Sequence, residues 1–177
     1  MNTHDHPNYD CLASLQEVMR RIRLSDGRSH KKAEELVMEV LNAPKSIINI
    51  DAKDICELFQ GDEEILLLEI SVNEMSETRM KQLMEVIEKE VAHLEYFNQL
   101  LMYFFVPQDS PLTMDELNTF LDYTNLNYGL SEVIWGSVFV PSQQPAIRAI
   151  MMLQHGVSEK THSRLATDEK DLRFSVT

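Results

Sequence analysis

Two short and nearly continuous apolar runs constrain the fold of this chain more than any other feature. They are ILLLEISV at residues 65–72 and LLMYFFV at residues 100–106, and each has the length of a β-strand. A strand that is apolar on both faces belongs inside a sheet that other elements cover. The segment between the two runs carries apolar residues at helical spacing, which predicts a long helix over residues 76–95.

The remaining patterns extend this centre into an α+β architecture. We expect further helices at residues 10–24, 29–42, 52–60 and 113–124, and strands at residues 132–140 and 146–154. Thr113 and Glu116 form a T-x-x-E capping box at the start of one of these helices.

The connections between these elements predict the topology. The short loop at residues 141–145 favours an antiparallel pair of the last two strands. Two strand–helix–strand units followed by this hairpin give a two-layer sandwich, in which helices pack on a four-stranded mixed sheet. The helix at residues 10–24 is an extra N-terminal element.

Composition and charge limit the classes of function. The 177 residues are 44% hydrophobic and 25% charged, as expected for one globular domain. The net charge of −13 disfavours binding to nucleic acid or to an anionic membrane. Cys11 and Cys56 form no disulfide framework, the first residues are polar rather than a signal peptide, and no apolar run approaches the roughly 20 residues of a membrane span. We therefore expect a cytoplasmic protein.

The sequence holds no motif for unaided nucleotide chemistry. Its five glycines each stand alone, and neither G-x-x-x-x-G-K-[ST] nor G-x-G-x-x-G is present. We therefore predict no cofactor and no enzyme activity of the chain by itself.

Histidine patterns do not predict a metal site. His4 and His6 lie in the polar start of the chain, and Glu90 with His93 makes a single E-x-x-H pair. A di-metal helical bundle needs two such pairs and further carboxylates. We predict solvated side chains here, and we interpret Cys56 as a small core residue.

Asn49, Asp51 and Asp54 cluster at the expected start of the helix at residues 52–60. Acidic residues in this position cap the orphan N–H groups of a helix and suit its dipole. Alternatively, Asp51 and Asp54 lie one helical turn apart, so that both could face the same way and orient a water molecule or a cation. The spacing alone leaves both interpretations open.

The run INIDAKDI at residues 48–55 resembles the catalytic loop of the FtsZ/tubulin family, whose bacterial form is close to INVDFADV. Further runs follow in the family's order: DSPLTMDE at residues 109–116, VIWGSV at residues 133–138 and IRAIMM at residues 147–152. The resemblance implies the fold of the family's C-terminal domain over residues 29–156. It leaves residues 1–28 as a helical extension and residues 157–177 as a polar tail, where Leu172, Phe174 and Val176 alternate like an edge strand.

Several family features are missing from this sequence. The nucleotide-binding half is absent with its glycine-rich loop, and Glu69 and Ser71 replace glycines that usually follow the first strand of the C-terminal domain. The family's C-terminal peptide that recruits division partners is not recognisable in residues 157–177. The resemblance therefore implies the fold and the loop without the complete activity.

In the family, GTP bound to one subunit is hydrolysed when the loop of the next subunit completes the site. The resemblance implies that Asp51 and Asp54 would polarise the attacking water in trans, while Asn49 and Lys53 would contact the nucleotide or the partner. Our first hypothesis is that the chain docks on an FtsZ-type filament and caps it or regulates GTP hydrolysis in bacterial cell division.

Two other hypotheses belong to different classes. The chain could be a non-catalytic scaffold that self-associates or binds an unrelated partner, with the aspartates kept only as a helix cap. It could also be a small-molecule enzyme with a site in a cleft of the sheet, although no nucleophile or base constellation supports this.

Overall fold

The centre of the molecule is a mixed sheet of five strands in the order β1-β2-β5-β3-β4. The computed structural model describes residues 7–44, 48–73, 78–92, 97–128, 130, 132–142 and 145–155. The strands are β1 (Ile22–Leu24), β2 (Ile65–Val72), β3 (Phe97–Pro107), β4 (Glu132–Val140) and β5 (Ile147–His155). β1 runs parallel to β2 and β3 runs parallel to β4, while β5 lies antiparallel between β2 and β3.

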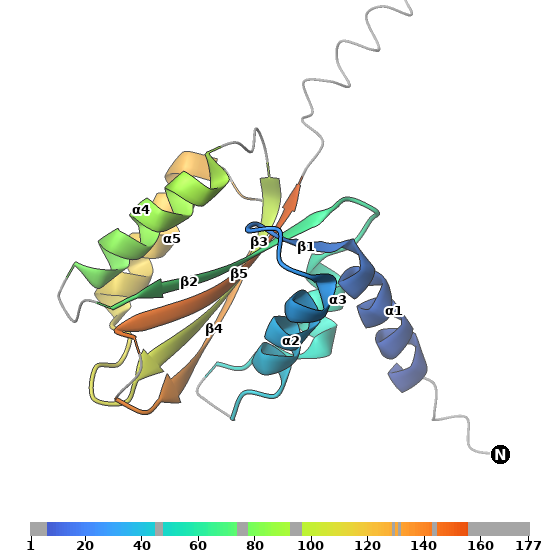
Figure 1. The fold of residues 1–177 in the computed structure, drawn as a ribbon, viewed down its shortest axis with the longest axis horizontal. Helices are drawn as coiled ribbons and strands as arrows, with labels where there is room; N and C mark the ends of the chain where they lie inside the picture. The colour runs from blue at the N-terminus through green and yellow to red at the C-terminus, as the bar shows by residue number, and fades with distance from the viewer. Residues whose placement is uncertain are drawn as a thin grey trace, which may run out of the picture.

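Helices cover both faces of this sheet (Figure 1). They are α1 (Pro7–Arg21), α2 (His30–Leu41), α3 (Ala52–Leu58), α4 (Arg79–Val91) and α5 (Met114–Tyr128). α1, α2 and α3 pack on one face, around buried residues such as Leu67, Tyr103 and Ile150. α4 and α5 pack on the other face, around residues such as Leu68 and Phe104.

The α+β class and the mixed sheet are confirmed, and the strand at residues 65–72 is found where the sequence predicts it. The capping box is also confirmed: the Thr113 N–H donates to Glu116 Oε2 at 2.9 Å, and the Glu116 N–H donates to Thr113 Oγ1 at 3.2 Å. The structure differs from the prediction in having three layers instead of two. The reason is that strands with apolar side chains on both faces need helices on both faces.

A fifth strand replaces the end of the predicted N-terminal helix. The helix ends at Arg21, and Ile22–Leu24 pairs with Ile65–Leu67 at the edge of the sheet. Ile22 and Leu24 are buried while Arg23 is exposed, which is the alternation of a strand. Three residues are too few for this alternation to be separated from helical spacing in the sequence.

The predicted hairpin of the last two strands is wrong. β5 pairs with β2 and β3, so that β3 separates it from β4. Ala149, Ile150, Met151 and Met152 are all buried, so β5 needs a partner layer on both faces and takes a central position. β4 is only partly buried along much of its length and forms the edge. The tail at residues 157–177, including the expected edge strand, lies outside the described residues.

Candidate functional site

The aspartates singled out in the sequence lie on the segment that leads into α3. We call residues 48–54 the Asp51 loop. Along its first part burial alternates, because Ile48 is half-buried, Asn49 exposed, Ile50 buried and Asp51 exposed. This alternation is that of an extended chain lying against the sheet, and it turns Asn49 and Asp51 towards solvent.

Asp51 and Asp54 cap α3 reciprocally. The Asp54 N–H donates to Asp51 Oδ1 at 2.9 Å, and the Asp51 N–H donates to Asp54 Oδ2 at 2.8 Å. Asp51 is the N-cap residue and Asp54 the third residue of the helix, so the pair forms a capping box. The structure thus brings together the two predicted site residues and confirms their capping interpretation, while a role in hydrolysis stays a prediction.

The other two predicted site residues flank the cap. Asn49 precedes it on the exposed side of the loop. Lys53 lies on the first turn of α3, and its ammonium group is 3.5 Å from a carboxylate oxygen of Glu57. The side chains of Lys53 and Glu57 are each more than 60% exposed, so their ion pair contributes little to stability and leaves Lys53 accessible to a partner.

Buried apolar side chains fix α3 on the sheet. Ile55, Leu58 and Phe59 are at most 1% exposed and belong to the core between α1, α2 and the sheet. Seven residues are too few for a helix that is stable by itself. Packing and capping together therefore hold the orientation of the Asp51 loop.

Arg21 holds the other end of α3, a contact that sequence reasoning missed. Its guanidinium donates to the carbonyl oxygen of Phe59 at 2.6 Å and to that of Glu63 at 3.1 Å. Phe59 is the C-cap residue of α3. The N-terminal helix α1 thereby fixes the helix that carries the candidate site, and no local signal in the sequence indicates a bond across 38 residues.

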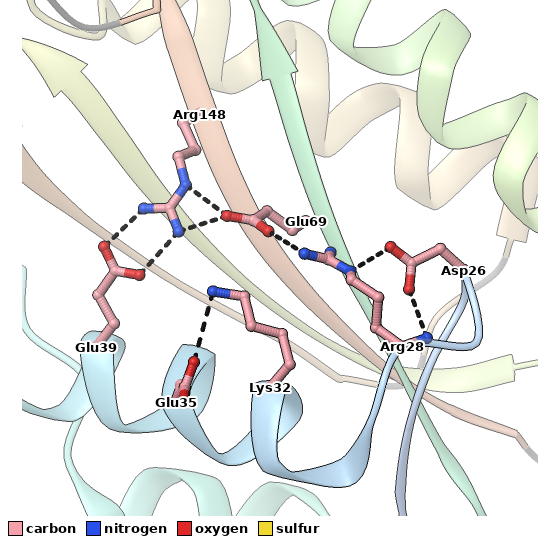
Figure 2. A network of polar contacts seen from close by, with 7 residues as sticks. All are labelled: Asp26, Arg28, Lys32, Glu35, Glu39, Glu69 and Arg148. Atoms are coloured by element: carbon pink, nitrogen blue, oxygen red, sulfur yellow. Dashed lines mark hydrogen bonds and ion pairs between the residues drawn. The ribbon is translucent and has the colours of Figure 1, made fainter.

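A network of ion pairs links α2 to the face of the sheet that α3 also covers (Figure 2). Arg148 on β5 binds both carboxylate oxygens of Glu39 at 2.7 and 2.8 Å and one oxygen of Glu69 at 2.7 Å. Arg28 binds the other Glu69 oxygen at 3.1 Å and also pairs with Asp26. Glu39, Glu69 and Arg148 lie 30 or more positions apart in the chain, so only the fold brings them together.

The charges in this network affect one another. Burial would raise the pKa of the Glu69 carboxyl, but hydrogen bonds from Arg148 and Arg28 outweigh it and hold the pKa below its usual value. The Arg148 guanidinium also lies 4.6 Å from the centre of the Phe105 ring. The network fastens α2 to the sheet, and its three carboxylates exceed its two guanidinium groups by one negative charge.

Metal and membrane sites can be assessed only for the described part of the chain. No group of three or more His, Cys, Asp or Glu side chains there could hold a metal ion. Cys56 is half-buried on α3, and Glu90 is exposed on α4, whereas His4, His6 and His93 lie outside the described residues. None of the described helices has both the length and the apolar character that a bilayer crossing requires.

Known proteins resemble this chain in structure and not detectably in sequence. No protein-family model and no curated protein matches it. Among solved structures, TubZ-Bt in a four-stranded filament superposes with a TM-score of 0.58 and 9% identity, over 81% of this chain and 38% of that one. A GTPγS-form protofilament of Bacillus thuringiensis serovar israelensis TubZ superposes with a TM-score of 0.53 and 10% identity, over 94% of this chain and 48% of that one. CetZ from Methanosaeta thermophila superposes with a TM-score of 0.52 and 14% identity, over 80% of this chain and 42% of that one.

These identities are too low to show more than the fold. The chain spans less than half the length of each of these neighbours. TubZ and CetZ are proteins of the FtsZ/tubulin family. The chain therefore has an FtsZ/tubulin-like fold.

Proposed function

We propose that this chain docks through its Asp51 loop onto a polymer of an FtsZ-type GTPase and thereby caps or regulates the polymer. In this proposal the chain corresponds to the C-terminal domain of the family and acts in the cytoplasm of a bacterium during cell division. It hydrolyses no nucleotide by itself, and at most it supplies Asp51 and Asp54 to a site on the partner.

The observation that supports the proposal is the presentation of the loop. Asn49, Asp51 and Lys53 are exposed, while the backbone that carries them is fixed by the capping box and by the buried side chains of α3. A fixed backbone with exposed polar groups can dock without a large ordering cost. The fold around the loop is shared with proteins solved as a filament and as a protofilament.

The proposal takes the chain as a cap rather than as a full subunit. A head-to-tail polymer grows only when each subunit offers two complementary faces. The chain spans less than half the length of its structural neighbours, and it contains no glycine-rich phosphate loop. A subunit that can offer only the loop face would bind one end of a polymer and stop its growth.

A second candidate is a self-associating scaffold without a catalytic role. The observation that favours it is that reciprocal capping already gives Asp51 and Asp54 a structural reason to be present. In that case the loop would have no partner that carries a nucleotide.

Two double variants separate these roles. Asparagine is as good an N-cap as aspartate, so D51N/D54N removes the two negative charges but keeps the cap. D51A/D54A removes the two charges and the cap. We would measure pelleting with an FtsZ-type polymer and phosphate release for each variant and for K53A.

The outcomes differ between the forms of the proposal. If the carboxylates act in hydrolysis, D51N/D54N still pellets with the polymer but no longer changes the rate of phosphate release. If the loop only docks, D51N/D54N keeps the effect of the native chain and D51A/D54A weakens it. A native chain that changes neither the amount of pelleted polymer nor phosphate release at equimolar protein contradicts docking and leaves the scaffold.

A further inference from the structure

We infer that Gly136 and Ser137 on the edge strand β4 are positioning residues for the Asp51 loop. The effect on docking rests on the proposed function. The placement of the loop by these two residues can be tested without a partner. In the sequence, the run VIWGSV indicates the fold only and assigns neither residue a role at the site.

A backbone hydrogen bond ties the loop to the edge of the sheet. The Ser137 N–H donates to the Ile48 carbonyl oxygen at 3.2 Å, and the two residues form an isolated antiparallel bridge. In a parallel ladder the N–H groups of successive residues point to opposite sides of the strand. Because the Ser137 N–H is bonded to Ile48, it points away from β3 and towards the loop.

Gly136 makes the close approach of the loop possible. A Cβ atom at this position would lie 2.8 Å from two carbon atoms of the Tyr103 ring and 3.1 Å from the Ile48 carbonyl oxygen. Among the described glycines, Gly27 and Gly61 have positive φ and Gly136 does not. The requirement for glycine here is thus one of space and not of backbone conformation.

Tyr103 cannot yield to a larger residue. Its side chain is fully buried, and the Phe105 ring packs edge-on against it with 5.3 Å between ring centres. Close-packed interiors resist the insertion of even one methyl group. A Cβ atom at position 136 would therefore displace β4 from Tyr103 or push away the Ile48 carbonyl, and either shift acts on the bridge between Ile48 and Ser137.

Movement at Ile48 would reach the candidate site directly. Asn49 follows it, and Asp51 is three residues away with its N–H inside the capping box. The buried Ile50 side chain and the Ser137 bridge are two anchors of the segment before the cap. Loss of one of them should misplace Asn49 and allow the cap to open more often.

The deciding variant is S137P, with S137A as its matched control. Proline removes the N–H that points to the loop, and an edge strand tolerates proline where the N–H faces outward. Alanine keeps that N–H. Trp135, the single tryptophan of the chain, lies two residues away and reports by its fluorescence whether β4 itself is intact.

The first readout is amide hydrogen exchange. The N–H groups of Asp51 and Asp54 are bonded in the capping box, and we expect their exchange to quicken by about 2- to 13-fold in S137P, the factor that corresponds to loss of one ordinary hydrogen bond. S137A should exchange like the native chain, and the Trp135 emission should be the same in all three. Equal exchange in S137P and S137A, with both folded, overturns the inference.

The second readout is pelleting with an FtsZ-type polymer. S137P and G136A should lower the pelleted polymer less than the native chain does, and S137A should lower it equally well. If the native chain changes neither the pelleted polymer nor phosphate release, the proposed function fails while hydrogen exchange still decides the positioning role. If S137P exchanges faster but acts on the polymer like the native chain, the positioning role stands and its consequence in docking is overturned. If S137P does not fold, G136A takes its place, and both readouts then compare G136A with the native chain.

Discussion

At the scale of single residues, the structure gives Asp51 and Asp54 a definite local task. Their reciprocal hydrogen bonds close the N-terminus of a helix of seven residues. A capping side chain fixes the backbone and keeps its own carboxylate at the surface, so the structural and the proposed functional role do not exclude each other.

The cap makes a prediction about stability. D51A should lower the free energy of unfolding by about 1 kcal/mol because it removes the acceptor for the Asp54 N–H. D51N should change it by much less, since asparagine offers an equivalent acceptor. Urea unfolding of the two variants measures the difference, and equal destabilisation by both would contradict the capping role.

Arg79 is the most strongly bonded buried charge in the described structure. Its side chain is 4% exposed, pairs with Glu116 at 2.6 and 2.9 Å, and donates to the carbonyl oxygens of Ser110, Pro111 and Ala146. These bonds join the starts of α4, α5 and β5.

Removal of Arg79 should therefore be costly. R79M leaves the partly buried Glu116 carboxylate without its guanidinium partner and three carbonyl oxygens without their donor, so it should lower the free energy of unfolding by about 3–5 kcal/mol. R79K keeps the charge but not the planar fork and should be intermediate. A loss below 1 kcal/mol in R79M, measured by urea unfolding, would contradict the assigned role.

The same ion pair predicts a response to acid. Burial would raise the pKa of the Glu116 carboxyl, but hydrogen bonds from Arg79 and from the Thr113 N–H outweigh it and hold the pKa below its usual value. A lowered pKa stabilises the folded state at pH values above the unfolded pKa, about 4.3, and this stabilisation is lost as the pH falls through the lower folded value.

E116Q should consequently weaken the dependence of stability on pH below about 4.3. E57Q is the matched control, because Glu57 is 63% exposed in its side chain and bonds only at the surface in the described structure. Urea unfolding between pH 7 and pH 3 compares the two, and an equal slope in E116Q and the native chain would contradict the argument.

At the scale of elements, the N-terminal α1 and β1 are part of the body of the fold. β1 extends the sheet beside β2, and Arg21 bonds the end of α3. The short α3 is thus held from both ends, by its own capping box and by a residue of α1.

This arrangement predicts that Arg21 controls the mobility of α3. R21M removes two hydrogen bonds from a charged donor and should speed amide exchange in α3 more than in α4, which lies on the opposite face of the sheet. R21K retains the charge and should have a smaller effect. Equal protection of α3 in R21M and the native chain would show that Arg21 does not hold it.

The elements also show what sequence patterns can predict. The strand at residues 65–72 and the Thr113 capping box were predictable because each depends on neighbouring residues. The central place of β5 was not, since it depends on which strands β5 meets. The same holds for the Arg148 network and for the contact of Gly136 with Ile48, whose members lie far apart in the chain.

At the scale of the whole molecule, the structure combines an FtsZ/tubulin-like fold with less than half the length of its neighbours. Its net charge of −13 means that association with a similarly charged partner needs screening by salt or a local patch of opposite sign. The exposed Lys53 beside Asp51 offers both signs at the loop.

The most direct test of the proposed capping role is sedimentation of an FtsZ-type polymer formed with GTP, at increasing substoichiometric amounts of this chain. A cap acts on polymer ends, which are few, so we predict that a small molar fraction of the chain lowers the pelleted polymer or changes phosphate release. Unchanged polymer and unchanged phosphate release up to equimolar amounts would contradict the account and would direct attention to an unrelated partner.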